Sequence, residues 1–592
     1  MAQYENLHLS ADVGSFRLLE FDSSSDGPCS DETTIYTKMA NYDCHNAPKY
    51  EALSYTWSSH HDELATIKLN GCSILVTKNL FEALRQLRLN QVENCKSESK
   101  LWVDAICISQ ADDAEKSQQV LLMRDIYANA SRVIAWIGKP DSLSSLAFDT
   151  LERFAADDGT LVGSATYQKT LDIAEERTAA IKLLIERSYF ERVWVIQELV
   201  VARRATIFCG PLSMAFDKFY LAVERMTGSG FYPLSATTKN ITYLGDWRSY
   251  YLEMATPGKR EERDGMLGLS LFMDARDRKA TNLRDKIYSL RAIAYNDLAS
   301  GIKIDYSHDN SVERVYTDFT KLVLNICPDL RILSAVIGRH RANTTLLLPS
   351  WVPDWSQPKY GGGMLNRYLY RFRPGSWFRA GGPRKPRVTI AEDSDTLFLE
   401  GIRLDTVSRV IPIKSILMAK DESCAVTEAI LQQLAGQLGS LDNYPFTSEP
   451  FWIAFFRTLT ADRTALSPRI REEYRAKFLT TSTAWKLDHE ALEQNLPANA
   501  WAEISKGIAI IIEDKDMFLT EQGYLGLGHE GFQVGDVVCV FTGGEVPFLL
   551  RECDTPRSEV CRLLSECYIH GVMDGEAMQG LQSEPVERFE IV

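Results

Sequence analysis

Short apolar segments and longer segments of helical periodicity alternate through the first 210 residues. The apolar segments are predicted to be buried strands, and they are residues 50–57, 101–108, 132–138 and 205–210. Leucines at helical spacing predict a helix over 79–89. Asp112, followed three residues later by Glu115, resembles a capping box that opens a second helix. Strand, helix and strand at this spacing predict right-handed βαβ units, so we expect an α/β domain with a parallel sheet.

Three further segments complete the predicted N-terminal domain. Asn70 and Gly71 lie between two strand-like segments, and they predict a hairpin over 66–77 because Asn-Gly fits a two-residue turn. Residues 139–180 are predicted as a helical insertion. Residues 189–204 are predicted as one helix that precedes the last strand.

The remainder of the chain changes character twice. A mainly helical pattern continues to about residue 340, and Gly and Arg become frequent over 356–387. The last part is mixed, with helices predicted over 425–510 and a β-rich end. The predicted regions are a 1–210 α/β domain, a 211–355 helical region, a 356–387 loop or linker and a 388–592 mixed α+β region with a small β-rich module.

Composition excludes several classes of protein. The net charge of −15 argues against a general nucleic-acid or acidic-membrane binder, because phosphate attraction needs a positive surface. Basic and aromatic residues interleave over 359–387, which leaves single-stranded nucleic acid as an alternative to a solvated loop there. Twelve cysteines without a CxxC pair indicate free thiols in a reducing compartment, and no signal peptide or membrane span is visible. We expect a cytoplasmic protein.

The candidate catalytic residue is Glu198. Its helical neighbours are Trp194, Val195, Val201 and Ala202, none of which is basic. A carboxylate on such an apolar surface is costly unless something pairs with it, and carboxylates of this kind are over-represented at functional sites. The competing interpretation is structural: a distant Arg or a backbone N–H satisfies Glu198.

Ligands of open parallel sheets bind beyond the carboxyl ends of the strands. The candidates there are Trp57, Ser58, Ser59, Ser109, Gln110 and Asp112. Trp102 and Asp104 are predicted on one face of a strand, where the carboxylate either holds a loop or touches a ligand. Residues 60–63 (His, His, Asp, Glu) are adjacent in sequence, so we expect a solvated loop and no metal. The sequence has no GxSxG, Walker A or Rossmann loop, which weakens hydrolase, NTPase and dinucleotide-fold interpretations.

Three segments resemble the fungal HET (heterokaryon incompatibility) domain in order and spacing. They are residues 50–57, 101–138 and 192–210, and parts of full-length members are similar to 284–288, 351–355, 535–551 and 568–576. Two positions depart from the family pattern. Ser58 stands where the family usually has Gly, and Ser109 where it usually has Asn.

The HET domain in turn resembles the TIR domain, a flavodoxin-like fold of innate immune signalling. Several TIR domains cleave NAD with a helical Glu, and the segment from Trp194 to Leu199 is similar to their motif. The resemblance implies a catalytic role for Glu198 and nucleotide contacts beyond Tyr55. The strand ends and the resemblance together predict a set of substrate-binding residues: Tyr55, Trp57, Ser58, Trp102, Asp104, Ser109, Gln110 and Trp194.

The resemblance implies an effector of fungal self/non-self recognition and programmed cell death. Two mechanisms stay open: hydrolysis of NAD at the nicotinamide–ribose bond, and non-catalytic signalling through assembly. We expect NAD or a related nucleotide as substrate rather than a bound cofactor, a homo-oligomer on activation and a protein partner from an incompatible strain. We expect no membrane or nucleic-acid partner.

Overall fold

The computed structural model describes the chain in segments, within which all the structural statements below are made. These are residues 9, 14–22, 34–57, 63–93, 100–156, 175–228, 236–254, 266–294, 296–327, 329–337, 345–358, 378–391, 394–413, 443–462, 511–512, 514–553, 560–579 and 586–592. The chain divides into two compact units: residues 1–264 with 277–311, and residues 265–276 with 312–592. The four regions expected from the sequence stay a prediction.

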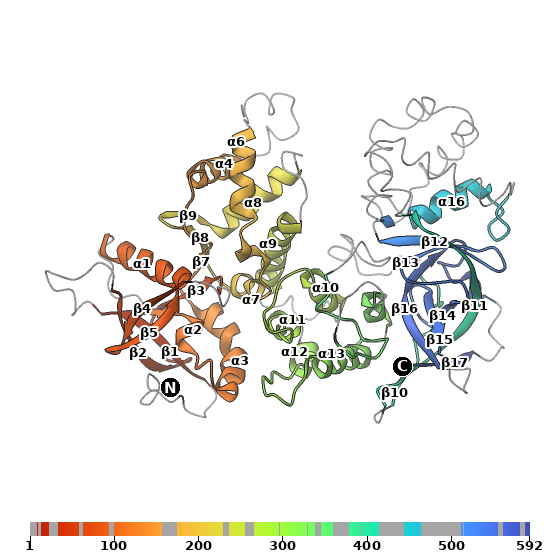
Figure 1. The fold of residues 1–592 in the computed structure, drawn as a ribbon, viewed down its shortest axis with the longest axis horizontal. Helices are drawn as coiled ribbons and strands as arrows, with labels where there is room; N and C mark the ends of the chain where they lie inside the picture. The colour runs from red at the N-terminus through yellow and green to blue at the C-terminus, as the bar shows by residue number, and fades with distance from the viewer. Residues whose placement is uncertain are drawn as a thin grey trace. The chain divides into compact units, whose positions relative to one another are not determined.

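The first unit is built on a mixed sheet flanked by helices (Figure 1). Its strands are β1 (Ser15–Phe21), β2 (Tyr36–Asp43), β3 (Tyr50–Tyr55), β4 (Leu64–Leu69), β5 (Cys72–Thr77), β6 (Lys100–Trp102), β7 (Arg132–Trp136), β8 (Ala205–Cys209) and β9 (Leu212–Ala215). Its helices are α1 (Lys78–Glu93), α2 (Asp104–Cys107), α3 (Asp113–Asn129), α4 (Ser144–Ala156), α6 (Glu175–Ile185), η3 (Ser188–Glu191), α7 (Trp194–Val200), α8 (Phe216–Gly228), α9 (Ala236–Met254), α11 (Asp285–Tyr288), η4 (Arg291–Ile293) and α12 (Asn296–Gly301).

The strand order of this sheet is β5-β4-β2-β1-β6-β3-β7-β8-β9. The strands β6, β3, β7 and β8 pair in parallel, and counted along the chain their order is 2-1-3-4. On one side β1, β2, β4 and β5 extend the sheet, and on the other side β9 does, mainly through antiparallel pairing. The expected parallel sheet therefore forms only the centre of a mixed sheet. The α/β class and the parallel centre are right.

Two sequence expectations for individual elements are confirmed. The hairpin over 66–77 forms as β4 and β5, and Asn70 (φ 49°) with Gly71 (φ 83°) makes the left-handed turn that this pair favours. Asp112 caps α3, because its carboxylate accepts hydrogen bonds from the backbone N–H groups of Ala114 and Glu115 at 3.0 Å each.

Two other expectations are wrong, and both errors bear on the site. The strand expected over 101–108 ends at Trp102, and Asp104 begins the one-turn helix α2. A short apolar run does not by itself distinguish a strand from a buried helical turn. The single helix expected over 189–204 is instead the 3₁₀ turn η3 followed by α7, with Arg192 extended between them.

The second unit combines helices with a closed antiparallel sheet. Its elements are α10 (Met266–Ala275), α13 (Val312–Ile326), η5 (Arg331–Ala335), β10 (Val388–Ile390), β11 (Leu397–Ile411), α16 (Phe451–Leu459), β12 (Lys515–Thr520), β13 (Leu525–His529), β14 (Val537–Phe541), β15 (Phe548–Glu552), β16 (Val560–Ile569), η7 (Glu576–Met578) and β17 (Glu587–Ile591). The order β11-β12-β13-β16-β15-β14 closes because β14 also pairs with β11. Its interior is apolar and includes Val407, Phe518, Val538, Val540 and Leu549.

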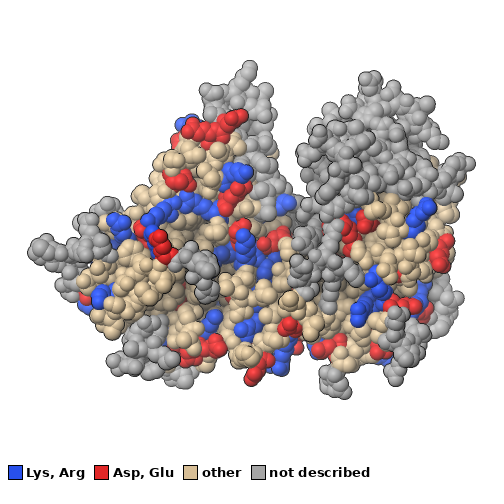
Figure 2. All heavy atoms as spheres, viewed as in Figure 1, with Lys and Arg blue, Asp and Glu red and all other residues tan. Residues whose placement is uncertain are grey.

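The β-rich end expected from the sequence is thus confirmed. The basic and aromatic segment 359–377 and most of the helices expected over 425–510 lie outside the described residues. Among the described helices, none has the length and apolar character needed to cross a membrane. On the face shown in Figure 2, basic and acidic side chains occur in both units, so the net charge there does not form one acidic surface.

Candidate functional site

Glu198 lies in α7 with only 2% of its surface exposed. Its Oε2 accepts a hydrogen bond from the Ser54 hydroxyl, and the Ser54 Oγ lies 2.6 Å from the Tyr189 hydroxyl. Ser54 belongs to β3, one residue before its carboxyl end, and Tyr189 belongs to η3. The partner of Glu198 is therefore a neutral hydroxyl from the sheet rather than the arginine or backbone N–H that the structural interpretation expected.

Burial governs the ionisation of Glu198. It raises the pKa of the carboxyl from 4.5 to about 7, because desolvation disfavours the charged form. The positive charge of Arg192 and the hydrogen bond from Ser54 act in the opposite direction, whereas the carboxylate of Asp104 adds to the rise. Glu198 thus changes charge in the neutral range, where general acids and bases of enzymes operate.

A second buried carboxylate, Asp104, lies at the same end of β3. Its Oδ2 accepts a hydrogen bond of 2.9 Å from the Trp57 indole, and the Tyr55 hydroxyl also donates to it. Burial raises the pKa of Asp104, and the charge of Arg192 opposes this rise. Tyr55, Trp57 and Asp104 are therefore brought together, as the sequence predicts for a site beyond the strand ends.

The predicted pairing of Trp102 with Asp104 on one strand face is wrong, because β6 ends before Asp104. Trp102 is fully buried and packs edge-on against Tyr127, with ring centroids 5.2 Å apart. A base could not stack on it in this conformation. Trp57, by contrast, is 41% exposed and offers an accessible aromatic face.

The remaining predicted site residues support the site from outside or lie apart from it. Trp194 donates its indole N–H to Asp285 Oδ2 at 2.9 Å, which ties α7 to α11. Gln110 donates to the carbonyl of Asp104 at 3.1 Å and so braces α2. The backbone N–H of Ser109 donates to Glu115, which packs against Arg17 rather than the site. Ser58 lies outside the described residues.

Sequence reasoning missed three residues of this site: Ser54, Tyr189 and Arg192. Ser54 had a detectable signal, since it is the polar residue in an otherwise apolar strand centre. Arg192 lies too far from Glu198 in sequence to be a helical neighbour, yet its charge lowers the pKa of both Glu198 and Asp104. A kink between η3 and α7, invisible in the periodicity, brings it there.

Buried arginines fix the segment that carries Glu198. Before α7, Arg278 donates to the carbonyls of Phe190 at 3.0 Å and Asn240 at 2.5 Å, and burial lowers the pKa of its guanidinium to about 9. After α7, Arg248 donates to the carbonyls of Leu199 and Ala202. Of these carbonyls, that of Leu199 belongs to the last turn of α7, whose carbonyls have no partner within the helix.

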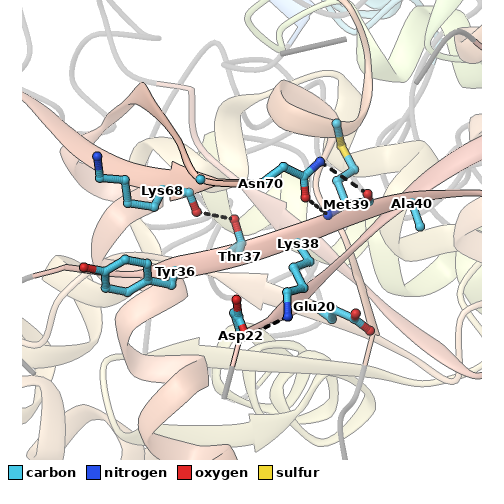
Figure 3. A pocket seen from close by; sticks show the side chains of 10 residues that line it. Glu20, Asp22, Tyr36, Thr37, Lys38, Met39, Ala40, Lys68 and Asn70 are labelled. Atoms are coloured by element: carbon cyan, nitrogen blue, oxygen red, sulfur yellow. Dashed lines mark hydrogen bonds and ion pairs between the residues drawn. The ribbon is translucent and has the colours of Figure 1, made fainter. Parts of the chain in front are cut away.

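A pocket of about 510 Å³ lies away from these residues, on the outer half of the sheet (Figure 3). Its lining residues are Glu20, Asp22, Tyr36, Thr37, Lys38, Met39, Ala40, Lys68, Asn70 and Gly71. Lys38 pairs with Asp22 at 2.9 Å across it, and the Asn70 side chain bonds to the Met39 backbone. No residue predicted for the site lines it, so the pocket is not the Glu198 site.

Comparison with known proteins gives matches at both ends of the chain. Residues 50–198 match the family described as heterokaryon incompatibility protein (HET), and residues 484–586 match the Het-6 beta-barrel domain. A curated relative from Neurospora crassa, heterokaryon incompatibility protein 6, OR allele, is 23% identical over 672 aligned positions. The alignment covers 98% of this chain and 97% of that protein. No solved structure matches.

Proposed function

The chain belongs to the heterokaryon incompatibility (HET) proteins, as a homologue of heterokaryon incompatibility protein 6 over nearly its whole length, and from this premise we propose that its first unit hydrolyses NAD. The proposed bond is the one between nicotinamide and ribose, and the proposed catalytic carboxylate is Glu198. The observation that carries the proposal is a buried carboxylate with a pKa of about 7 that accepts a hydrogen bond from Ser54, near the carboxyl end of β3.

The position of Glu198 supports the proposal. The parallel order 2-1-3-4 is that of flavodoxin-like sheets, whose ligands bind at the carboxyl ends beside the first and third strands. In this sheet those strands are β3 and β7, and Ser54 on β3 holds the carboxylate. A TIR-like fold for the parallel centre is part of the same proposal.

The chemistry requires little beyond one ionised carboxylate. As the C1′–N bond breaks, its electron pair leaves with neutral nicotinamide, and the ribose develops an oxocarbenium-like cation. Ionised Glu198, held by Ser54, stabilises this cation electrostatically. Water then adds at C1′ and loses its proton, so NAD⁺ and water give ADP-ribose, nicotinamide and H⁺. No cofactor is needed.

Burial also implies regulation. With Glu198 only 2% exposed, substrate reaches it after the site opens, so we propose that association activates the protein. In this scheme the protein acts in the cytoplasm, a protein from an incompatible strain triggers it, and programmed cell death follows from loss of NAD. No membrane or nucleic-acid partner is part of the scheme.

Nicotinamide release from NAD by the purified full chain tests the proposal. Glu198→Gln keeps the shape of the side chain and removes the charge, so we expect a loss of at least about 100-fold, the range of electrostatic contributions of this kind. Glu191→Gln is the matched control, because Glu191 lies in η3 and pairs with Lys279 instead. Equal cleavage by both variants would rule out Glu198 as the catalytic residue.

A second function, non-catalytic assembly, is favoured by the edge strand β5. It ends the strand order of the sheet and carries no charge over Cys72–Thr77, whereas natural edges usually carry Lys, Pro or a bulge. Leu75 on β5 is 68% exposed, and Leu64 on β4 is 60% exposed. An uncharged strand can pair with its copy across a two-fold axis without like-charge repulsion, so we propose a second copy of this chain as its partner.

Measurement of the molar mass in solution against protein concentration separates the two functions. Leu75→Lys introduces charge at the edge and should abolish association, whereas Leu183→Lys, at a 53% exposed leucine in α6, should leave it intact. Cell death that persists in Glu198→Gln but disappears in Leu75→Lys would favour assembly without catalysis.

A further inference from the structure

Arg192 differs from the other inward-facing arginines of the first unit. It lies between η3 and α7, partly exposed, and its Nη1 donates to the carbonyl of Tyr55 at the end of β3. Among the described residues, no hydrogen bond or ion pair engages its other guanidinium N–H groups. Arg17, Arg248 and Arg278 each use several donors on carbonyls or carboxylates.

The charge of Arg192 is directed at the candidate site without being neutralised there. It lowers the pKa of both Glu198 and Asp104, yet burial keeps both values raised, and neither carboxylate forms an ion pair with it among the described residues. A guanidinium that is fixed at one nitrogen and has further donors available suits a planar anion with two acceptor oxygens.

Three groups around Arg192 match successive parts of a dinucleotide. Glu198 and Ser54 lie where the scissile ribose would be placed, and exposed Trp57 offers a face on which a base stacks. Arg192 donates a hydrogen bond to the Tyr55 carbonyl and lies between the end of β3 and α7. Its charge is therefore close to the strand end and to the helix that carries Glu198. The anionic group that joins the scissile ribose to the adenosine of a dinucleotide, its pyrophosphate, would meet this guanidinium.

We propose that Arg192 binds a phosphate group of the substrate, so that the site selects phosphate-bearing nucleotides over nucleosides. The proposal rests on the proposed function for the identity of the substrate. Binding itself can be measured without turnover, because ADP-ribose and adenosine have no nicotinamide–ribose bond to break. The role of Arg192 is therefore separable from catalysis by Glu198.

The experiment is a calorimetric titration of the full-length protein with ADP-ribose and, separately, with adenosine. Arg192→Gln should weaken ADP-ribose binding about tenfold or more, the usual scale of a charge-assisted bidentate contact, and leave adenosine binding unchanged. Arg192→Lys keeps the charge but loses the two-pronged guanidinium. Its affinity for ADP-ribose should therefore lie between those of the unsubstituted protein and Arg192→Gln. Arg204→Gln, at an exposed arginine before β8, is the matched control and should change neither affinity.

Several outcomes would overturn the proposal. One is that the unsubstituted protein does not bind ADP-ribose at millimolar concentration. Another is that Arg192→Gln binds ADP-ribose as tightly as the unsubstituted protein does. A third is that Arg192→Gln loses the same factor of affinity for ADP-ribose and for adenosine. Thermal unfolding of Arg192→Lys, which can still donate to the Tyr55 carbonyl, controls for a folding defect. Arg192-dependent ADP-ribose binding without NAD cleavage would refute the proposed function alone, and cleavage with an unchanged KM in Arg192→Gln would refute this inference alone.

Discussion

At the scale of single residues, the burial of Glu198 sets both its reactivity and its energetic cost. A carboxyl whose pKa is raised from 4.5 to about 7 is destabilised in its charged form by burial away from water. Proteins retain such a residue where its chemistry is used, because a neutral residue of the same shape would be less costly.

The cost of Glu198 predicts a pH-dependent effect of Glu198→Gln on stability. The native state binds the proton more tightly than the unfolded chain, so stability falls as pH rises from about 4.5 to about 7 and stays low above that. Glu198→Gln removes this loss, which amounts to about 3 kcal/mol. Thermal unfolding should show the variant more stable at pH 8 and nearly unchanged at pH 4. Equal stabilisation at both pH values would contradict a raised pKa.

Ser54 should set the pH at which NAD cleavage begins. Its hydroxyl donates to Glu198 and so favours the ionised form, which the proposed mechanism requires. Ser54→Ala removes that donor, raises the pKa of Glu198 further and should move the acidic limb of the kcat–pH profile upward by about one unit. Ser73→Ala, at an exposed serine of β5, should not move it. A lower rate with an unshifted limb would instead indicate a packing defect.

At the scale of elements, α7 depends on side chains distant in sequence. Seven residues make too few internal hydrogen bonds for a helix to form alone. Arg248 bonds to Leu199 in the last turn of α7, and Arg278 bonds to Phe190 in η3, before α7 begins. Of the helix predicted over 189–204, the part from Trp194 to Val200 forms as α7. Its bounds could not be predicted, because the arginines that bond to the residues around it lie at positions 248 and 278.

Arg248 should therefore control the stability of the Glu198 helix. Arg248→Gln leaves the carbonyls of Leu199 and Ala202 buried without their donor, which should cost about 3 kcal/mol and increase hydrogen exchange over 194–202. Arg203→Gln is the control, since Arg203 is exposed and only its carbonyl contacts Arg248. Unchanged exchange over 194–202 in Arg248→Gln would show that packing alone holds α7.

At the scale of the whole molecule, the two units respond to pH in opposite directions. In the first unit, burial raises the pKa of Glu198, Asp104 and Asp285. In the second unit, His570 and Arg457 lower the pKa of Glu449 to about 2, in spite of burial. The charged form is thus disfavoured in one core and favoured in the other.

This contrast predicts which unit responds to acid. As pH falls from 7 to 5, the first unit should gain stability, because its raised carboxyls take up protons in the native state. Below about pH 4 the second unit should lose stability as Glu449 is protonated, and Glu449→Gln should lose about 3 kcal/mol at pH 7. Calorimetry with Glu198→Gln and Glu449→Gln assigns the transitions. A single transition, shifted equally by both variants, would contradict separate responses.

The sequence alone determined the elements whose signals are local. The Asn-Gly hairpin, the Asp112 cap and the apolar strands 50–57 and 132–138 follow from short-range sterics and side-chain spacing, and the structure has all of them. It also singled out Glu198, because a carboxylate on an apolar helix is visible without any structure. Only the tertiary structure decided where the second apolar strand ends, which strands extend the parallel centre, and that Ser54, Tyr189 and Arg192 surround Glu198. Those outcomes depend on contacts between residues far apart in the chain, and no pattern of spacing records such contacts.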